Sequence, residues 1–144
     1  MKDMSTKRAV GIIINDEKVL LIHRFCDGRE YYVFPGGGVD ENETVEDAVK
    51  RELKEELGIE ITLGTLLFHH PNTAFGRTRE EFYFLVTEFN GTPQWIGETV
   101  HEEQTETNRF KPVWVNVSKI KNLDNLYPEI AKQKLIKYLA NILS

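Results

Sequence analysis

Apolar runs separated by turn residues predict several β-strands along the chain. The runs at 8–15 and 18–25 flank a turn at 15–17, which predicts an antiparallel hairpin. A shorter run at 31–34 ends at Pro35, and the three glycines that follow give a loop the freedom to place its backbone. Further β-type runs cover 59–70, 80–89 and 111–117. Together these runs predict the strands of a sheet.

Two segments change from the two-residue period of a strand to the three- and four-residue steps of a helix. The first begins at Thr44, which with Asp47 is similar to a capping box, and ends at Gly58. Its apolar face consists of Val45, Ala48, Val49, Leu53 and Leu57. The second follows Pro128 and runs to the carboxy terminus, and its apolar stripe is expected to pack on the sheet. That stripe consists of Ile130, Ala131, Leu135, Leu139 and Ile142.

Composition limits the possible partners. A chain of 144 residues with 40% hydrophobic content fits a single domain, 1–144. The net charge of −5 and the lack of a basic run argue against binding polymeric nucleic acid. Cys26 is the only cysteine, so no internal disulfide can form and a reducing compartment is expected. The first apolar run is too short for a secretory signal or a membrane span, which predicts a cytoplasmic protein.

The stretch RELKEELG, residues 51–58, places three glutamates within the first predicted helix. On a helical wheel with Val45 at zero, Glu52 and Glu56 fall at about 340° and 20°, inside the apolar sector. Glu55 lies at the edge of that sector, near about 280°. A carboxylate buried without a partner loses several kcal/mol of hydration. These groups are therefore expected either to be protonated or to surround a cation.

Basic residues of the same helix do not balance these charges. Lys50 and Lys54 occupy the opposite, wet face, and only Arg51 borders the acidic site. One arginine cannot neutralise three carboxylates. Clustered carboxylate oxygens suit Mg²⁺ or Mn²⁺ better than Zn²⁺, and Mg²⁺ usually completes its coordination with water and substrate phosphates. The residues therefore indicate phosphate chemistry with a divalent metal.

The segment GGVDENETVEDAVKRELKEELGI, residues 37–59, resembles the Nudix box. Each defined position is filled, by Gly37, Glu43, Arg51, Glu52, Leu53, Glu55, Glu56, Gly58 and Ile59. So many fixed positions at fixed spacings make this a specific signal. The resemblance implies an α/β fold, namely a Nudix-type α/β/α sandwich with a mixed sheet. It also implies hydrolysis of a nucleoside diphosphate linked to another moiety, with a divalent metal.

The same resemblance implies a role for each acidic residue of the box. Glu52, Glu55 and Glu56 match the metal-binding carboxylates, and Glu52 is also a candidate for activating the attacking water. Gly37 matches the glycine whose backbone approaches the metal site. Two or three Mg²⁺ ions would then bridge phosphate oxygens and lower the pKa of a bound water, which attacks phosphorus.

Supporting residues follow from the resemblance as well. Glu43 and Arg51 are expected to brace the loop against the helix, and Gly58 to end the helix. Family members often draw another acidic residue from a loop before a late strand, and the acidic, aperiodic segment 97–108 corresponds to that loop. It offers Glu98, Glu102, Glu103 and Glu106. Of these, Glu103 is favoured as a further catalytic residue.

Residues outside the box supply further candidates. Arg24 and Arg77 are candidate phosphate ligands, and a role as plain surface arginines is the alternative for each. The same two interpretations apply to Arg79. His69 and His70 end a predicted strand and are expected to be structural or solvated. Aromatic side chains that could stack on a base, or else pack in the core, are Phe75, Tyr83 and Trp95.

The sequence limits the identity of the substrate less than it limits the fold or the reaction. A nucleoside triphosphate, oxidised or noncanonical ones included, is favoured, because Pro71 and Tyr83 do not match the downstream tags of ADP-ribose and dinucleoside-polyphosphate relatives. Hydrolysis of those two substrate types stays an alternative. A regulatory nucleotide-binding module is a second alternative, which the intact carboxylates disfavour. An isomerase acting on an isoprenoid diphosphate is a third and would need Cys26 as its catalytic cysteine. The chain is expected to be a monomer or a homodimer.

Overall fold

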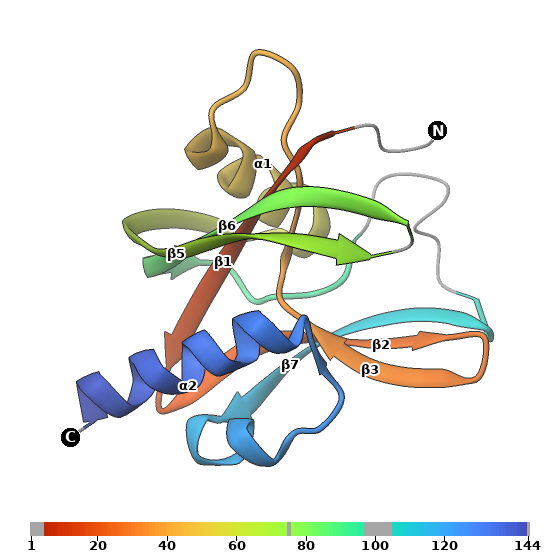
Figure 1. The fold of residues 1–144 in the computed structure, drawn as a ribbon, viewed down its shortest axis with the longest axis vertical. Coiled ribbons are helices and arrows are strands. Elements are labelled where there is room, and N and C mark those ends of the chain that lie inside the picture. Colours follow the sequence, from red (N-terminus) through yellow and green to blue (C-terminus); the bar gives the residue numbers. More distant parts are fainter. Residues whose placement is uncertain (1–4, 75, 97–104, 144) are drawn as a thin grey trace.

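The fold is a strongly curled mixed sheet with one long helix on each side (Figure 1). The computed structural model describes residues 5–74, 76–96 and 105–143. Its strands are β1 (Lys7–Asn15), β2 (Lys18–Cys26), β3 (Arg29–Val33), β4 (Gly36–Gly38), β5 (Glu60–Ala74), β6 (Arg77–Asn90), β7 (Asn108–Asn116) and β8 (Leu126–Tyr127). Its helices are α1 (Val45–Leu57), the short 3-10 helix η2 (Val117–Asn122) and α2 (Glu129–Leu143). The α/β class with a mixed sheet, expected from the sequence, is confirmed.

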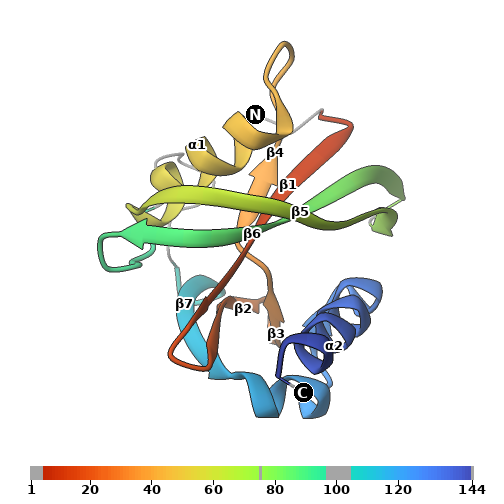
Figure 2. The same ribbon diagram turned by 90° about the vertical axis from the view of Figure 1, so that its left-hand side faces the viewer.

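β1 divides the sheet into two halves. Over Lys7 to Ile13 it runs parallel to β6, and it pairs antiparallel with β4. Only its last residues, Ile14 and Asn15, pair with β2, so the predicted hairpin is confirmed at its closed end alone. Beyond that point β2 pairs with β3 and β7, and the two halves splay apart (Figure 2). The splay leaves space between β1, β5 and β6 on one side and β2, β3 and β7 on the other.

Alternation along β1 supplies both hydrophobic cores. Ala9 and Ile13 pack in one core with the apolar face of α1, whereas Val10 and Ile12 pack in the other with α2. Successive side chains of a strand point to opposite faces, so one apolar strand can support a helix on each side. A Cβ at Gly11 would approach Leu53 Cδ1 to 2.9 Å, which shows how closely α1 lies over β1.

The ends of α1 match the predicted caps. Thr44 is the N-cap, and its hydroxyl accepts a hydrogen bond from the Asp47 N–H at 3.0 Å. Gly58 adopts a left-handed conformation with φ of 68° and donates its N–H to the Lys54 carbonyl. The helix that carries the three glutamates therefore begins and ends where the sequence indicates.

Three local expectations were wrong. The three glycines after Pro35 form strand β4 rather than a free loop, because β1 offers them an open edge to pair with. β5 continues to Ala74, so His69 and His70 lie within a strand. On α2, Ile130 and Ile142 are 43% and 50% exposed. Ile130 lies about 140° around the helix axis from the buried Leu135, and Ile142 belongs to the last turn.

In the described part of the chain, no helix combines the length and apolar character needed to cross a bilayer.

Candidate active site

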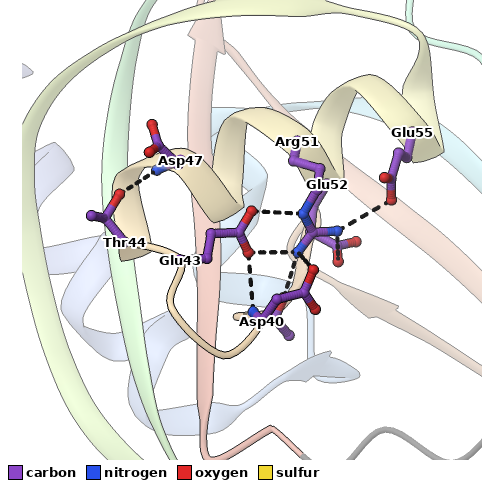
Figure 3. A network of polar contacts seen from close by, with 8 residues as sticks. Asp40, Glu43, Thr44, Asp47, Arg51, Glu52 and Glu55 are labelled. Carbon is purple, nitrogen blue, oxygen red and sulfur yellow. Dashed lines mark hydrogen bonds and ion pairs between the residues drawn. The ribbon is translucent and has the colours of Figure 1, made fainter.

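Arg51, in the middle of the acidic helix α1, is the centre of a polar network that joins the helix to the loop before it (Figure 3). Its Nε and Nη2 atoms donate to both carboxylate oxygens of Glu43, at 2.8 and 2.9 Å. Nη2 also donates to the Gly38 carbonyl at 3.0 Å. Hydrogen bonding to Arg51 is the largest cause that lowers the pKa of Glu43 below its ordinary value. Glu43 and Arg51 thus join the loop before α1 to strand β4 and to the helix.

The same guanidinium contacts two of the three box glutamates. Arg51 Nη1 donates to Glu52 Oε1 at 2.9 Å and to Glu55 Oε2 at 3.2 Å. Two carboxylate oxygens therefore converge on one cationic nitrogen. The Glu52 side chain is 15% exposed and that of Glu55 is 47% exposed, as their positions on the helical wheel predict.

Glu52 and Glu56, both partly buried, are in contact through their side chains. Burial raises the pKa of Glu52 above its ordinary value, and the charge of Glu55 adds to the rise. Arg51 and a hydrogen bond with the Glu56 side chain act in the opposite direction. Two carboxyl groups in contact are stable only with a shared proton or a cation between them. Glu56 also lines a cavity beside the helix.

Because Gly37 has no side chain, the backbone of β4 can lie close to the Glu52 carboxylate. It is buried in β4 opposite Ala9 of β1. A Cβ at this position would lie 2.4 Å from both Cδ and Oε2 of Glu52. The absence of a side chain therefore makes room for the Glu52 carboxylate against the strand.

The chemistry of these residues fits a hard divalent cation. Oxygen donors from Glu52, Glu55 and Glu56 lie on one helix turn, and Gly37 leaves space beside them. No group of three acidic, histidine or cysteine residues among those the structure describes is already arranged as a metal site. Arg51 instead holds Glu52 and Glu55. A set of protein ligands that does not fill the coordination sphere is compatible with Mg²⁺, because Mg²⁺ keeps several waters and takes phosphate oxygens as ligands.

Replacing Glu43 by glutamine is expected to lower the free energy of unfolding at pH 7 by about 2 kcal/mol, because the charged hydrogen bonds to Arg51 are weakened. The pKa of Glu43 is lower in the folded state than its ordinary value of 4.5. Its contribution is therefore complete above that value and is lost as the pH falls through the folded pKa. Urea unfolding of both proteins from pH 7 to pH 3 tests this. A difference that persists or grows toward pH 3 would contradict the assignment.

A cavity of about 510 Å³ opens between the two halves of the sheet. One wall comes from β1, β5 and β6, the other from β2, β3 and β7, and the end of α1 closes one side. Its charged lining residues are Arg8, Arg24, Arg29, Arg79, Glu56, Glu81 and Glu129. A protein with a net charge of −5 thus gathers four arginines around one cavity that also contains a box glutamate. Volume and lining suit a nucleotide-sized ligand.

The candidate phosphate ligands lie in different surroundings. Arg24 lines the cavity, where its guanidinium donates to Asn108 and lies 3.8 Å from the centre of the Phe110 ring. Arg77 is not among the lining residues, and its guanidinium donates to the Ser5 carbonyl. Arg79, two residues along β6, does line the cavity. Arg77 and Arg79 share a face of β6, so their position along the strand, and not the face, places Arg79 at the cavity.

The histidines and aromatic residues are mostly structural. His69 bonds to Glu80 at 2.8 Å, and His70, 4% exposed, stacks against Tyr83. Trp95 lines the cavity in a parallel stack with Phe110, the ring centroids being 4.2 Å apart.

Some predicted residues lie outside the described ranges. These are Phe75, Glu98, Glu102 and Glu103. Glu106 is described and lies exposed in a turn.

Sequence reasoning missed several lining residues. Arg8, Glu81 and Phe110 belong to strands, and their direction depends on a register that the sequence does not display. Glu81 did carry a signal, since it is a carboxylate two residues before Tyr83, next to the apolar part of the strand. Alternate residues of a strand share a face, so an acidic group there is a candidate for a cavity wall.

Comparison with known proteins decides the family. The model of the NUDIX domain matches residues 5–136, which include the whole box and both walls of the cavity. The chain belongs to the Nudix family. Accordingly it is a Nudix hydrolase, an enzyme that acts on nucleoside diphosphate derivatives.

Individual relatives agree with this assignment. A CTP pyrophosphohydrolase of Escherichia coli K12 is 38% identical over 96 residues, covering 65% of this chain and 67% of the relative. An 8-oxo-dGTP diphosphatase of Haemophilus influenzae is 34% identical over 101 residues, covering 68% and 70%. The solution structure of the E. coli ORF135 protein superposes with a TM-score of 0.71 at 28% identity, covering 93% of this chain and 89% of that one. The Nudix fold thus extends over nearly the whole chain.

Proposed function

We propose that this Nudix hydrolase is a nucleoside triphosphate pyrophosphohydrolase that acts on an ordinary or modified nucleotide. Water attacks the phosphoanhydride, and a triphosphate gives a nucleoside monophosphate and pyrophosphate. The observation that carries this proposal is the convergence of Glu56 with Arg8, Arg24 and Arg79 on one cavity. Cationic side chains bind the phosphate oxygens, and the carboxylate faces the bond to be cleaved.

Nudix hydrolases generally use a divalent metal, and we propose Mg²⁺, or Mn²⁺, at Glu52, Glu55 and Glu56. When bound, such an ion neutralises phosphate charge and lowers the pKa of a coordinated water. Glu52 is the candidate to accept the proton of the attacking water, because it is buried against Gly37 and touches Glu56. Arg51 and Glu43 hold the start of the helix so that these carboxylates keep their places.

Arg24 is the strongest candidate for holding the phosphate chain. Asn108 and the Phe110 ring fix its guanidinium at the cavity wall. A preorganised guanidinium loses less conformational entropy when it binds an anion than a free surface side chain does. Glu103 stays a proposal as the additional acidic residue.

The names of the relatives support a triphosphate, since one is a CTP pyrophosphohydrolase and another an 8-oxo-dGTP diphosphatase. The isomerase alternative receives no support from the geometry. Cys26, which it would need, contacts Asp27 and is not among the cavity-lining residues.

A panel of nucleotides assayed with and without Mg²⁺ tests the proposal. We expect ribo- and deoxyribonucleoside triphosphates to give monophosphate and pyrophosphate only when the metal is present. ADP-ribose and diadenosine polyphosphates serve as the competing substrates in the same panel. Exclusive turnover of these two would replace the triphosphate assignment, and nucleotide binding without any metal-dependent release would favour a regulatory module.

A further inference from the structure

A buried carboxylate lies on the cavity wall away from the acidic helix. Glu81 of β6 is 4% exposed and lines the cavity together with Asn72 and Tyr83. It belongs to β6, which pairs with β1 and β5 and does not contribute to the box. The cleavage chemistry proposed above makes no use of it.

Both oxygens of Glu81 accept hydrogen bonds from neighbouring side chains. Tyr83 donates its hydroxyl to Oε1 at 2.6 Å, and the Asn72 amide donates to Oε2 at 3.2 Å. Burial and the charge of Glu81 raise the pKa of Tyr83 well above its ordinary value, so the phenol keeps its proton and remains a donor.

Both donors are neutral, and each carboxylate oxygen can accept more than one hydrogen bond. A buried anion is costly unless its remaining acceptor capacity is used. Glu81 lines a cavity large enough for a nucleobase, and Arg8, its partner in register on β1, lines the same cavity as the nearby cation. A ligand that presents N–H groups would complete this arrangement.

A carboxylate offers two acceptors side by side and no donor, so it pairs best with two adjacent N–H donors. Among the nucleobases, guanine presents such an edge, with N1–H beside the N2 amino group. Cytosine and adenine place an acceptor next to their amino group, and uracil places its single N–H between two carbonyls. Oxidation of guanine at C8 leaves the N1 and N2 donors unchanged.

We propose that Glu81 recognises the Watson–Crick edge of guanine and makes guanine nucleotides, the 8-oxo form included, the preferred substrate class. The inference rests on the proposed function, because it assumes that the cavity holds the base of the nucleotide. Asn72 and Tyr83 act as positioning residues that hold the two oxygens of Glu81 toward the cavity.

A structural role for Glu81 makes a different prediction. If its bonds to Asn72 and Tyr83 only tie β5 to β6, replacing it lowers stability but leaves the preference among bases unchanged. Base selectivity is therefore the measurement that separates the two roles.

The test uses metal-free titration calorimetry with GMP, CMP, AMP and UMP as probes. In the unmodified protein we expect GMP to bind about tenfold to a hundredfold more tightly than CMP. Glu81→Gln replaces one acceptor by a donor, and its GMP-to-CMP affinity ratio is expected to fall close to one. Equal affinities in the unmodified protein, no measurable GMP binding, or a ratio unchanged in Glu81→Gln would each overturn the proposal.

Glu80→Gln is the matched control. Glu80 is the neighbouring residue of the same strand, it bonds to His69, and it is not among the lining residues. Its GMP-to-CMP ratio is expected to match that of the unmodified protein. Because the probes are monophosphates without metal, a failed hydrolysis assay would reject the proposed function and leave this measurement interpretable. If Glu81→Gln does not fold, the four affinities of the unmodified protein still decide the question.

Discussion

Replacing Glu56 by glutamine is expected to lower metal-dependent hydrolysis about a thousandfold, equivalent to about 4 kcal/mol of transition-state stabilisation. Glu56 lies where the acidic helix borders the cavity, and its carboxyl group contacts that of Glu52. Glutamine keeps the size of the side chain but removes the negative charge that a divalent cation requires. Rates of pyrophosphate release from a saturating triphosphate, measured over a series of Mg²⁺ concentrations, give the size of the loss.

Lys54→Gln provides the control on the same helix. The Lys54 side chain is 68% exposed and pairs with Glu60 on the surface. An exposed pair of this kind contributes little, so turnover and its Mg²⁺ dependence are expected to stay unchanged. Full turnover in Glu56→Gln, or an equal loss in both variants, would contradict the role assigned to the acidic helix.

The acidic helix could be predicted because its signals are local. Thr44, Gly58 and the apolar period fix the ends and the inner face of α1. The wheel then orders Glu52 and Glu55 by burial, in agreement with side chains that are 15% and 47% exposed in the fold. Helical geometry needs only the spacing of residues within one segment.

The i,i+4 spacing also accounts for the contact of Arg51 with Glu55, whereas the contact of Arg51 with the adjacent Glu52 does not follow from helical spacing.

The cavity could not be predicted because its lining comes from strands that are far apart in the sequence. Arg8, Arg24 and Phe110 meet only because β1, β2 and β7 adopt particular registers, and Glu81 joins them from β6. A shift of one residue would turn each of these side chains to the other face. Arg77 and Arg79 show a second limit, because they share a face of β6 and only their position along the strand places Arg79 at the cavity.

The glycines after Pro35 show how a local signal can indicate the correct chemistry and the wrong structure. Their conformational freedom suggested a loop, whereas Gly36 to Gly38 pair with β1 as strand β4. What Gly37 needs is the absence of a Cβ, because a side chain there would meet the Glu52 carboxylate. The need for glycine at position 37 thus comes from Glu52, fifteen residues later in the sequence, and the residues next to Gly37 do not indicate this contact.

Replacing Gly37 by alanine is therefore expected to lower metal-dependent turnover about a hundredfold while the fold is retained, since a displacement of about 1 Å at a catalytic group has an effect of that size. The new methyl group would lie 2.4 Å from Glu52 Oε2, and a flexible carboxylate moves more easily than a paired strand. We expect weaker Mn²⁺ binding by calorimetry and a higher Mg²⁺ concentration for half-maximal turnover. Gly64→Ala on β5 is the control, because its methyl group would meet Thr87 Cγ2 of β6 at 2.7 Å and none of the three box glutamates. Unchanged metal affinity in Gly37→Ala, with Tm equal to that of the control, would show that Glu52 does not depend on the space that this glycine leaves.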